Sequence, residues 1–417
     1  MAENRHTVLT VGAGAAGLFA AIAAAECGLN VVIIEKNQKV GRKLLITGKG
    51  RCNVTNNCSP QELINNIPTN GRFLYSTVNR FTPDDTISFF EGNGLKLKTE
   101  RGRRVFPVSD KAVDVVDTLY NCINKKKCKL INDTVTELII ENKTVKGVKT
   151  SGGRSLYADA VIIACGGKSY PGTGSTGDGY RLAEQAGHSI VPLKPSLVPI
   201  VSKDGFCKRL QGLSLKNVGI SVVSQKSGKT VYDDFGEMLF THFGMSGPLI
   251  LSASAHMRDI ATADYIVKID LKPALTLQQL DLRLQKDFSK NLNKDLINSL
   301  NELLPHKLIP IIVELSHIPP ETKCNSVTKQ QRAQLAALLK NFCVSADGFR
   351  PIEEAIITSG GVKTSEISPN TMQSKLVNGL YFAGEVIDVD AYTGGYNLQI
   401  AFSTGHLAGI SAAENSL

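Results

Sequence analysis

Three glycines and one carboxylate near the start of the chain have the residue types and spacing that bind a dinucleotide. Gly12 permits a tight turn, Gly14 lets the backbone approach a pyrophosphate, and Gly17 lets a helix pack closely against a strand. Glu35 follows about 20 residues later, where its carboxylate can accept hydrogen bonds from both hydroxyls of an adenosine ribose. These residues predict a dinucleotide site, but they do not distinguish FAD from NAD.

The elements that must position these residues lie in the same stretch. Apolar runs predict one strand over residues 8–11, before the glycines, and another over residues 31–34, which ends on Glu35. Between them, residues 18–25 are mostly small, which favours a helix that packs closely on a sheet. Strand, glycines, helix, strand and acid therefore follow in the order of a dinucleotide-binding βαβ unit.

A second stretch, residues 41–56, combines three glycines with the four cations Arg42, Lys43, Lys49 and Arg51. The backbone N–H groups and guanidinium forks of such a loop can wrap a phosphate-rich ligand. The same composition also fits an ordinary basic surface loop. The residues alone leave both interpretations open.

Composition places the chain among ordinary globular proteins. Its 417 residues exceed the usual size of one hydrophobic core, so two or three domains are expected. No apolar run is long enough to cross a bilayer, and residues 2–5 lack the pattern of a signal peptide, so a cytoplasmic protein without membrane contact is expected. Nine scattered cysteines indicate reduced thiols, and no Cys/His cluster has zinc spacing, so we expect no metal site.

The chain is basic, with a net charge of +9. This charge fits attraction of an anionic cofactor, and it also fits a polyanionic substrate such as RNA. Basic clusters at residues 101–104 and 125–127 could contact such a substrate, although neither is interleaved with aromatic residues. RNA or a small molecule is therefore the expected partner, and the oligomeric state is not predicted.

The motifs taken together resemble those of a known family. GxGxxG at the start is followed by GRKLLITGKGRCNVTN at residues 41–56 and, near the end, by GLYFAGE and GGYNLQIAFSTG. This order is similar to that of the BaiN/RdsA family of NAD(P)/FAD-dependent oxidoreductases, also called YhiN-like or aminoacetone-oxidase-like flavoproteins, and the likeness spans the chain. Activities reported in the family include reduction of C=C bonds in bile-acid intermediates, formation of dihydrouridine in large-subunit ribosomal RNA, and oxidation of small amines.

The resemblance implies FAD as the bound cofactor and an α/β fold. A Rossmann-type FAD-binding domain would be formed by both chain ends, residues 1–194 and 352–417. Short alternating runs predict an inserted β-rich domain over residues 195–274, and the resemblance implies that this domain lies on the substrate side. Leucines at three- and four-residue spacings, interrupted by prolines, predict a small helical subdomain over residues 275–351.

The resemblance also implies which residues bind FAD. Val135 would contact adenine through its backbone, and Gly384 and Glu385 would lie against the ribityl chain and pyrophosphate, where many flavoproteins carry Asp. The last helix, opening near Thr393, would point its N-terminus at the flavin pyrimidine and stabilise negative charge there. The full predicted set comprises Gly12, Gly14, Ala16, Gly17, Glu35, Lys36, Arg42, Lys43, Gly48, Gly50, Arg51, Cys52, Val135, Ala164, Gly166, Gly384, Glu385, Asn397 and Leu398.

A second GxGxxG, at residues 172–177, lacks the context of a nucleotide site. No strand directly precedes it, and the stretch after the following helix is broken by proline and carries no acid. We interpret it as a loop against the flavin or the substrate. NAD(P)H would then reach the flavin as a transient co-substrate.

The flavin itself would carry the hydride, so the protein must supply a proton. The candidate proton donors are Cys52, Tyr170, Tyr392 and Tyr396, and Arg51 or Lys49 could polarise a carbonyl or instead bind FAD phosphates. The predicted catalytic set is Cys52, Tyr170 and Arg51.

The leading functional prediction is an FAD-dependent reductase of an activated C=C bond, recharged by NAD(P)H. The net charge slightly favours uridine in ribosomal RNA over a steroid-like enone. The alternatives are an amine oxidase that releases peroxide, a thiol–disulfide reductase that uses Cys52 and Cys58, and a flavin-bound RNA-binding factor.

Overall fold

The computed structural model describes residues 6–257, 260 and 264–414. Residues 2–5, on which the expectation of no signal peptide rests, lie outside the described residues. The chain forms two compact units, one from Met1–Ser196 with Ile352–Leu417 and the other from Leu197–Pro351. The first unit is thus built from both ends of the chain. Within the described ranges, no helix is both long and apolar enough to span a bilayer.

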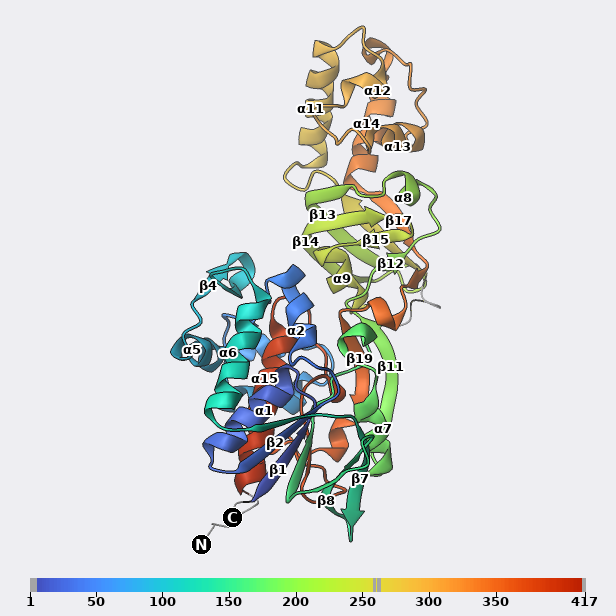
Figure 1. Ribbon diagram of the computed structural model, residues 1–417. Helices are drawn as coiled ribbons and strands as arrows, with labels where there is room; N and C mark the ends of the chain where they lie inside the picture. Colours follow the sequence, from blue (N-terminus) through green and yellow to red (C-terminus); the bar gives the residue numbers. More distant parts are fainter. Residues whose placement is uncertain (1–5, 258–259, 261–263, 415–417) are drawn as a thin grey trace. The chain divides into compact units, whose positions relative to one another are not determined.

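A five-stranded parallel sheet is the centre of the first unit (Figure 1). Its order is β20-β10-β1-β2-β6, with bounds Leu380–Phe382, Ala160–Ile163, Thr7–Val11, Asn30–Glu35 and Lys129–Asn132. Every residue of β10 is buried, as expected of a parallel strand covered on both faces. The two strands of the predicted βαβ unit, β1 and β2, lie side by side in this sheet, so their carboxyl ends share one edge.

Two helices with glycine contacts pack against this sheet. They are α1 (Ala15–Glu26) and α15 (Tyr396–Glu414), which run alongside each other (Figure 1). A Cβ at Gly405 of α15 would lie 2.3 Å from the carbonyl oxygen of Ala16, and one at Gly409 would lie 2.4 Å from that of Ala20. Only glycine permits this approach, which fixes the distance between the two helices.

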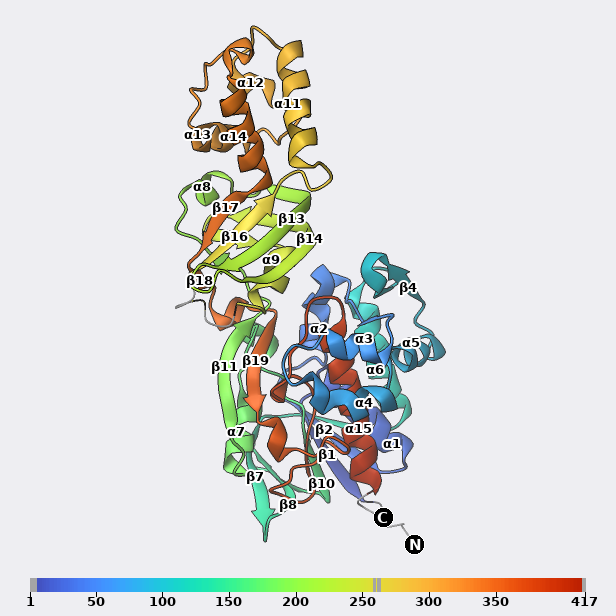
Figure 2. The ribbon, with the colours of Figure 1, turned by 180° about the vertical axis from the view of Figure 1, so that it is seen from behind.

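Smaller elements surround this core. Three further sheets have the orders β3-β5-β4, β7-β8-β9 and β11-β19, and Figure 2 shows β11 beside β19. Their strands are Thr55–Asn56, Arg104–Pro107, Leu97–Glu100, Val135–Glu141, Thr144–Thr150, Ser155–Tyr157, Ile190–Ser196 and Ile357–Val362. The helices α2 to α7 are Arg42–Ile46, Pro60–Asn65, Tyr75–Arg80, Pro83–Gly92, Ala112–Lys125 and Asp178–Gln185.

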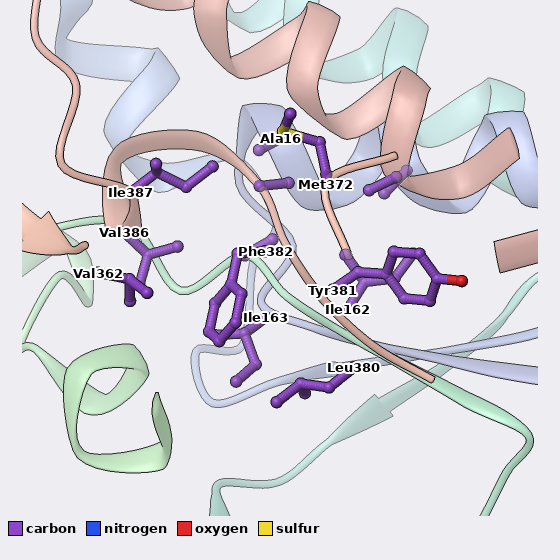
Figure 3. Packing of buried hydrophobic residues seen from close by; sticks show 14 of the residues in the cluster. Ala16, Ile162, Ile163, Val362, Met372, Leu380, Tyr381, Phe382, Val386 and Ile387 are labelled. Atoms are coloured by element: carbon purple, nitrogen blue, oxygen red, sulfur yellow. The ribbon is translucent and has the colours of Figure 1, made fainter. Parts of the chain in front are cut away.

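The hydrophobic core of the first unit joins residues from both chain ends. Ile162 and Ile163 of β10 pack with Tyr381 and Phe382 of β20, and all four residues are fully buried. Figure 3 shows the ring of Phe382 beside Ile163. Because β20 pairs with β10 in register, the C-terminal segment completes the sheet that the N-terminal segment begins.

The second unit contains a seven-stranded antiparallel sheet of order β17-β16-β13-β14-β15-β12-β18. In that order the strands are Phe342–Ala346, Tyr265–Asp270, Ser214–Ser224, Thr230–Thr241, Gly244–Ser246, Ile200–Val201 and Gly348–Phe349. The helices α8, α9 and α11 to α14 are Phe206–Arg209, Pro248–Ser254, Leu277–Lys290, Leu296–Ser299, Ile309–Leu315 and Lys329–Lys340.

The segment predicted as a helical subdomain, residues 275–351, differs from that expectation at its end. Its last residues form β17 and β18, which belong to the sheet of the preceding segment. Phe342, Val344 and Ala346 lie on the buried face of β17, so buried residues recur every two positions, as in a strand, and not every three to four, as in a helix. Sheet and helices also share one hydrophobic core.

Candidate cofactor site

The glycine turn between β1 and α1 has the shape of a pyrophosphate cradle. Gly12 has φ +100°, and its N–H donates to the carbonyl of Ile34 over 2.8 Å. A Cβ at Gly17 would lie 1.9 Å from the Gly12 carbonyl oxygen, which no other residue type allows. A Cβ at Gly14 would meet nothing within 4 Å, so the space before the N-terminus of α1 is open. Backbone N–H groups therefore face a space that a phosphate group fits.

Glu35 is held in place at the end of β2. One carboxylate oxygen accepts from the Ala13 N–H over 2.7 Å, and the other accepts from the Asn37 N–H over 2.8 Å and the Asn37 side chain over 2.6 Å. The residue is 8% exposed. Its orientation is thus set by the glycine turn itself, and lone pairs remain for the hydroxyls of a ribose.

The second GxGxxG segment, residues 172–177, lies beside Glu35 and contacts its neighbours Lys36 and Asn37. The Lys36 ammonium donates to Thr176 over 2.5 Å and to Asp178 over 2.6 Å, while the Asn37 side chain contacts the Thr173 carbonyl. Arg42 donates to the other end of the Asn37 amide over 2.9 Å. Residues 172–178 therefore lie along one side of the predicted ribose position. Among the described residues, no strand directly precedes them, as the sequence predicts.

Lys43 and Glu385, which are far apart in the sequence, form an ion pair of 2.7 Å. The second Glu385 oxygen accepts from Ser169 over 3.0 Å and from the Thr358 N–H over 2.8 Å. Neither side chain of the pair is more than 24% exposed. Three distant segments of the chain thus meet at one carboxylate, where the resemblance places the ribityl chain and pyrophosphate.

A Lys43→Met variant tests this cluster. We expect FAD to bind about tenfold more weakly, because the Glu385 carboxylate would lose its cationic partner beside the predicted pyrophosphate position, at a cost of about 1.5 kcal/mol. The measurement is a fluorescence titration of apoprotein with FAD. A Lys39→Met variant, which changes an exposed lysine of the same region, is the control. Equal dissociation constants for the two variants would contradict the assignment of Lys43.

The N-terminus of α15 is fixed against the strand β3. Gly395 has φ +99°, and a Cβ there would lie 2.4 Å from the Thr55 carbonyl oxygen. Asn56 donates to the Gly394 carbonyl over 3.0 Å. The Asn397 amide is used within the chain, since it bonds the N–H and carbonyl of Ala391 over 2.9 and 2.8 Å. The backbone N–H groups of Asn397 and Leu398, in the first helical turn, are then the groups that can face a ligand.

The glycines of the 41–56 loop differ in their surroundings. Gly48 has φ +56°, and a Cβ there would lie 2.9 Å from the Asn53 N–H nitrogen. A Cβ at Gly50 would meet nothing within 4 Å. The side-chain oxygen of Asn53 is buried and has no hydrogen-bond partner among the described residues. A ligand N–H would satisfy this acceptor, so this part of the loop fits a flavin.

Arg51 points to carboxylates of its own chain. Its guanidinium lies 2.5 Å from Glu100 and 2.5 Å from Asp110, and its centre is 4.2 Å from the Phe106 ring. Hydrogen bonds from Arg51 lower the pKa of Glu100, and those from Lys98 and Arg51 lower the pKa of Asp110. Arg51 therefore anchors the loop to β4 and the residues after β5.

These shifts predict acid sensitivity. Carboxyls with a folded-state pKa below the unfolded value stabilise the protein at higher pH, and this contribution is lost as pH falls through the folded pKa. We therefore expect the anchored loop to loosen below about pH 4, the ordinary range of carboxyl pKa values. Flavin fluorescence followed during an acid titration measures the pH at which flavin is released. The Glu100→Gln variant should release flavin at a higher pH than the unchanged protein. Coincident titration curves would rule out this anchor.

The three predicted catalytic residues differ in their surroundings. Cys52 is 0% exposed in a hydrophobic cluster, and burial raises the pKa of its thiol to about 12. A thiol held protonated in this way is a poor proton donor at neutral pH, while the place of Cys52 among the FAD-binding residues stays a prediction. Tyr170 is 37% exposed and follows Ser169, so it remains a candidate, whereas Arg51 is committed to its two carboxylates.

The remaining predicted residues lie around the turn and the strand ends. Ala16 and Ala164 are buried beside the glycines, and Gly166 has φ +73°. The Val135 carbonyl accepts from Arg181 over 3.2 Å, at the start of β7. Burial raises the pKa of the Tyr396 hydroxyl. Within the described ranges, no group of three or more His, Cys, Asp or Glu residues is arranged to hold a metal ion.

Four residues that the sequence motifs do not predict also shape the site. Asn37 orients Glu35, Ser169 and Thr358 bind Glu385, and Asn53 presents a buried amide oxygen. Asn37 stands two residues after Glu35 and Asn53 lies inside the 41–56 loop, so both positions were a usable signal. Ser169 and Thr358 have no local signal, because only the fold brings them to Glu385.

Two solved structures share the fold of this chain. The open conformation of a flavocytochrome c3 fumarate reductase matches with a TM-score of 0.53 and 17% identity, covering 99% of this chain and 78% of that one. The 3-ketosteroid delta1-dehydrogenase of Sterolibacterium denitrificans matches with a TM-score of 0.53 and 15% identity, over 98% and 100% of the chains. At this identity the likeness shows the fold, and it confirms the predicted Rossmann-type α/β architecture.

Relatives in sequence span nearly the full length. A 3-dehydro-bile acid delta(4,6)-reductase of Clostridium scindens is 34% identical over 97% of this chain and 98% of the relative. A ribosomal RNA dihydrouridine synthase of Escherichia coli is 33% identical over 96% of both chains. The sequence profile described as HI0933-like protein Rossmann domain matches residues 6–411. The chain therefore belongs to this HI0933-like family, as the BaiN/RdsA resemblance predicts, and is an FAD-dependent oxidoreductase.

Proposed function

We propose that the protein reduces an activated C=C bond with hydride from FAD that NAD(P)H recharges, and that uridine in ribosomal RNA is favoured over a steroid-like enone. The observation that carries the proposal is the N-terminus of α15, which is fixed by Gly395 against Thr55 and carries no acidic residue in its first turn. Such a helix end stabilises the negative charge of reduced flavin. The names of the two full-length relatives both describe addition of hydrogen to a double bond.

Bound FAD would supply the hydride chemistry, and the chain's own residues would bind the cofactor, orient it and protonate the substrate. Glu35 binds the ribose hydroxyls, and the glycine turn binds the pyrophosphate. Lys43 keeps the Glu385 carboxylate charge-compensated. Tyr170 remains as the donor for the carbon next to the one that receives hydride, since its hydroxyl belongs to an exposed side chain beside the Ser169–Glu385 contact.

Electron donation is tested first. Residues 172–177 are tied to Lys36 and follow no strand directly, so NAD(P)H would reach the flavin from solution. Anaerobic addition of NADH or NADPH to the holoprotein should bleach the flavin absorbance with at least one of them. A flavin that neither nicotinamide bleaches would argue against the proposal.

The substrate is tested by mass spectrometry of ribosomal RNA and small-molecule extracts from strains with and without the gene. We expect one dihydrouridine to disappear from the RNA when the gene is deleted. An unchanged RNA together with an accumulated enone would assign the small-molecule substrate. Rapid peroxide release with amines, without either change, would support an amine oxidase instead.

The thiol–disulfide alternative has no support from the cysteines. Cys52 is buried in the core, and burial raises the pKa of Cys58 to about 11. All nine cysteines are free thiols in the structure. An exchange reaction needs an accessible thiolate, which neither of these residues provides.

A further inference from the structure

The positive charge of the FAD-binding unit is concentrated in one hairpin. Residues 96–104, which form β4, the turn and the start of β5, hold five basic side chains and one acidic side chain. The remaining residues of this unit hold 23 basic and 23 acidic side chains, so the rest of the unit is neutral. This uneven distribution separates the hairpin from a surface that is charged only for solubility.

The single carboxylate of the hairpin does not offset its arginines. Glu100 binds the Arg51 guanidinium at 2.5 Å and lies 3.6 Å from Lys98. Arg101 and Arg104 are exposed, and within the described ranges neither pairs with a carboxylate. Arg104 donates to the Arg101 carbonyl over 3.1 Å, which holds the two residues together. Two guanidinium groups are therefore left for an external anion.

Hydrogen bonds tie the turn to the cofactor site. Gly102 and Arg103 have φ of +74° and +58°, and Arg103 binds both oxygens of Glu62 at 2.9 and 2.8 Å. Asn56 donates to the Gly102 carbonyl over 3.0 Å and, from the same amide, to the Gly394 carbonyl over 3.0 Å. One side chain thus connects the basic turn to the N-terminus of α15, where the flavin is expected.

We propose that Arg101 and Arg104 bind the phosphate backbone of an RNA whose target base reaches the flavin. This inference rests on the proposed function and adds the place where the polymer is held. Guanidinium forks match phosphate geometry, and the hairpin offers no aromatic platform for stacking bases. The hairpin therefore binds the charged phosphates of RNA without selecting its base sequence. Specific choice of the base is then left to the flavin site.

The test compares holoprotein variants for binding of a fluorescein-labelled oligouridylate by anisotropy at several salt concentrations. Arg101→Ala/Arg104→Ala should weaken binding about tenfold at physiological salt and reduce the salt slope by about 1.4, the value for two lost contacts to a single strand. Arg101→Lys/Arg104→Lys should retain most of the affinity. Arg101→Glu alone, at an exposed side chain, serves if the double variant folds poorly.

The matched control is Lys125→Ala/Lys126→Ala/Lys127→Ala, at the end of α6. Lys126 lies 3.3 Å from Glu26, at the end of α1 opposite the glycine turn, so this cluster is remote from the cofactor. We expect its RNA affinity to stay within twofold of the unchanged protein. Equal losses in the two sets of variants would show a general charge effect and overturn the inference.

Phosphates of NADPH are a second source of the same ligand chemistry. The rate of flavin reduction at limiting NADPH is therefore measured in each variant, and it should not change. Slower reduction with unchanged RNA affinity would assign the arginines to the nicotinamide and overturn the inference. Loss of RNA binding in a protein that forms no dihydrouridine would instead contradict the proposed reaction and leave the RNA contact standing.

Discussion

Replacing Glu35 with glutamine is expected to weaken FAD binding about 100-fold. The carboxylate accepts from Ala13 on one oxygen and from Asn37 on the other. An amide has only one acceptor oxygen, so in either rotamer its NH2 group faces a backbone N–H. The ribose also loses a charged acceptor, and together these changes cost about 3 kcal/mol, which corresponds to that loss of affinity.

Fluorescence titration of the apoprotein with FAD measures this loss. The matched control is Glu26→Gln, at the other end of α1 in the same βαβ unit, where the side chain is 49% exposed. The control should bind FAD as the unchanged protein does. If Glu35→Gln bound FAD within threefold of the control, the βαβ unit would not be the adenosine site.

The first site motif could be predicted because its physics is local. Gly12 needs a positive φ and Gly17 a missing Cβ, and both requirements are met within the same turn. Glu35 follows from the length of one helix and one strand. Such features depend on short-range geometry, which a sequence pattern records directly.

Cys52 shows where this reasoning stops. It lies in the most specific motif of the chain, next to Arg51, and a thiol there invites a catalytic interpretation. Its side chain instead fills the core, while the neighbouring guanidinium turns to Glu100. Motif spacing does not specify which way each side chain points, because burial is decided by segments distant in sequence.

Ser169 and Thr358 show a second limit. Both bind Glu385, yet the three residues come from three separate segments of the chain. Likewise β17 lies in a segment whose sequence predicts helices, because its pairing partner β16 lies about 75 residues earlier, beyond any local pattern. Long-range pairing is set by the whole fold.

The distance between α1 and α15 should control cofactor binding, because both helices present their N-termini to it. A Cβ at Gly405 would lie 2.3 Å from the carbonyl oxygen of Ala16, well inside van der Waals contact. The helix backbone cannot rotate away, since Gly409 makes the same approach to Ala20 one turn later. Relief of the clash therefore requires the two helices to separate.

Gly405→Ala is accordingly expected to destabilise the protein by about 2 kcal/mol, since overpacking outweighs the gain of about 1 kcal/mol in helix propensity. FAD affinity should fall with it, because both helix N-termini move. Gly92→Ala is the matched control, since Gly92 also lies in a helix, α5, but a Cβ there meets nothing within 4 Å. Urea unfolding followed by circular dichroism should place the midpoint of Gly92→Ala at or above that of the unchanged protein and the midpoint of Gly405→Ala below it. If Gly405→Ala kept both its midpoint and its FAD affinity, close packing of α1 on α15 would not position the site.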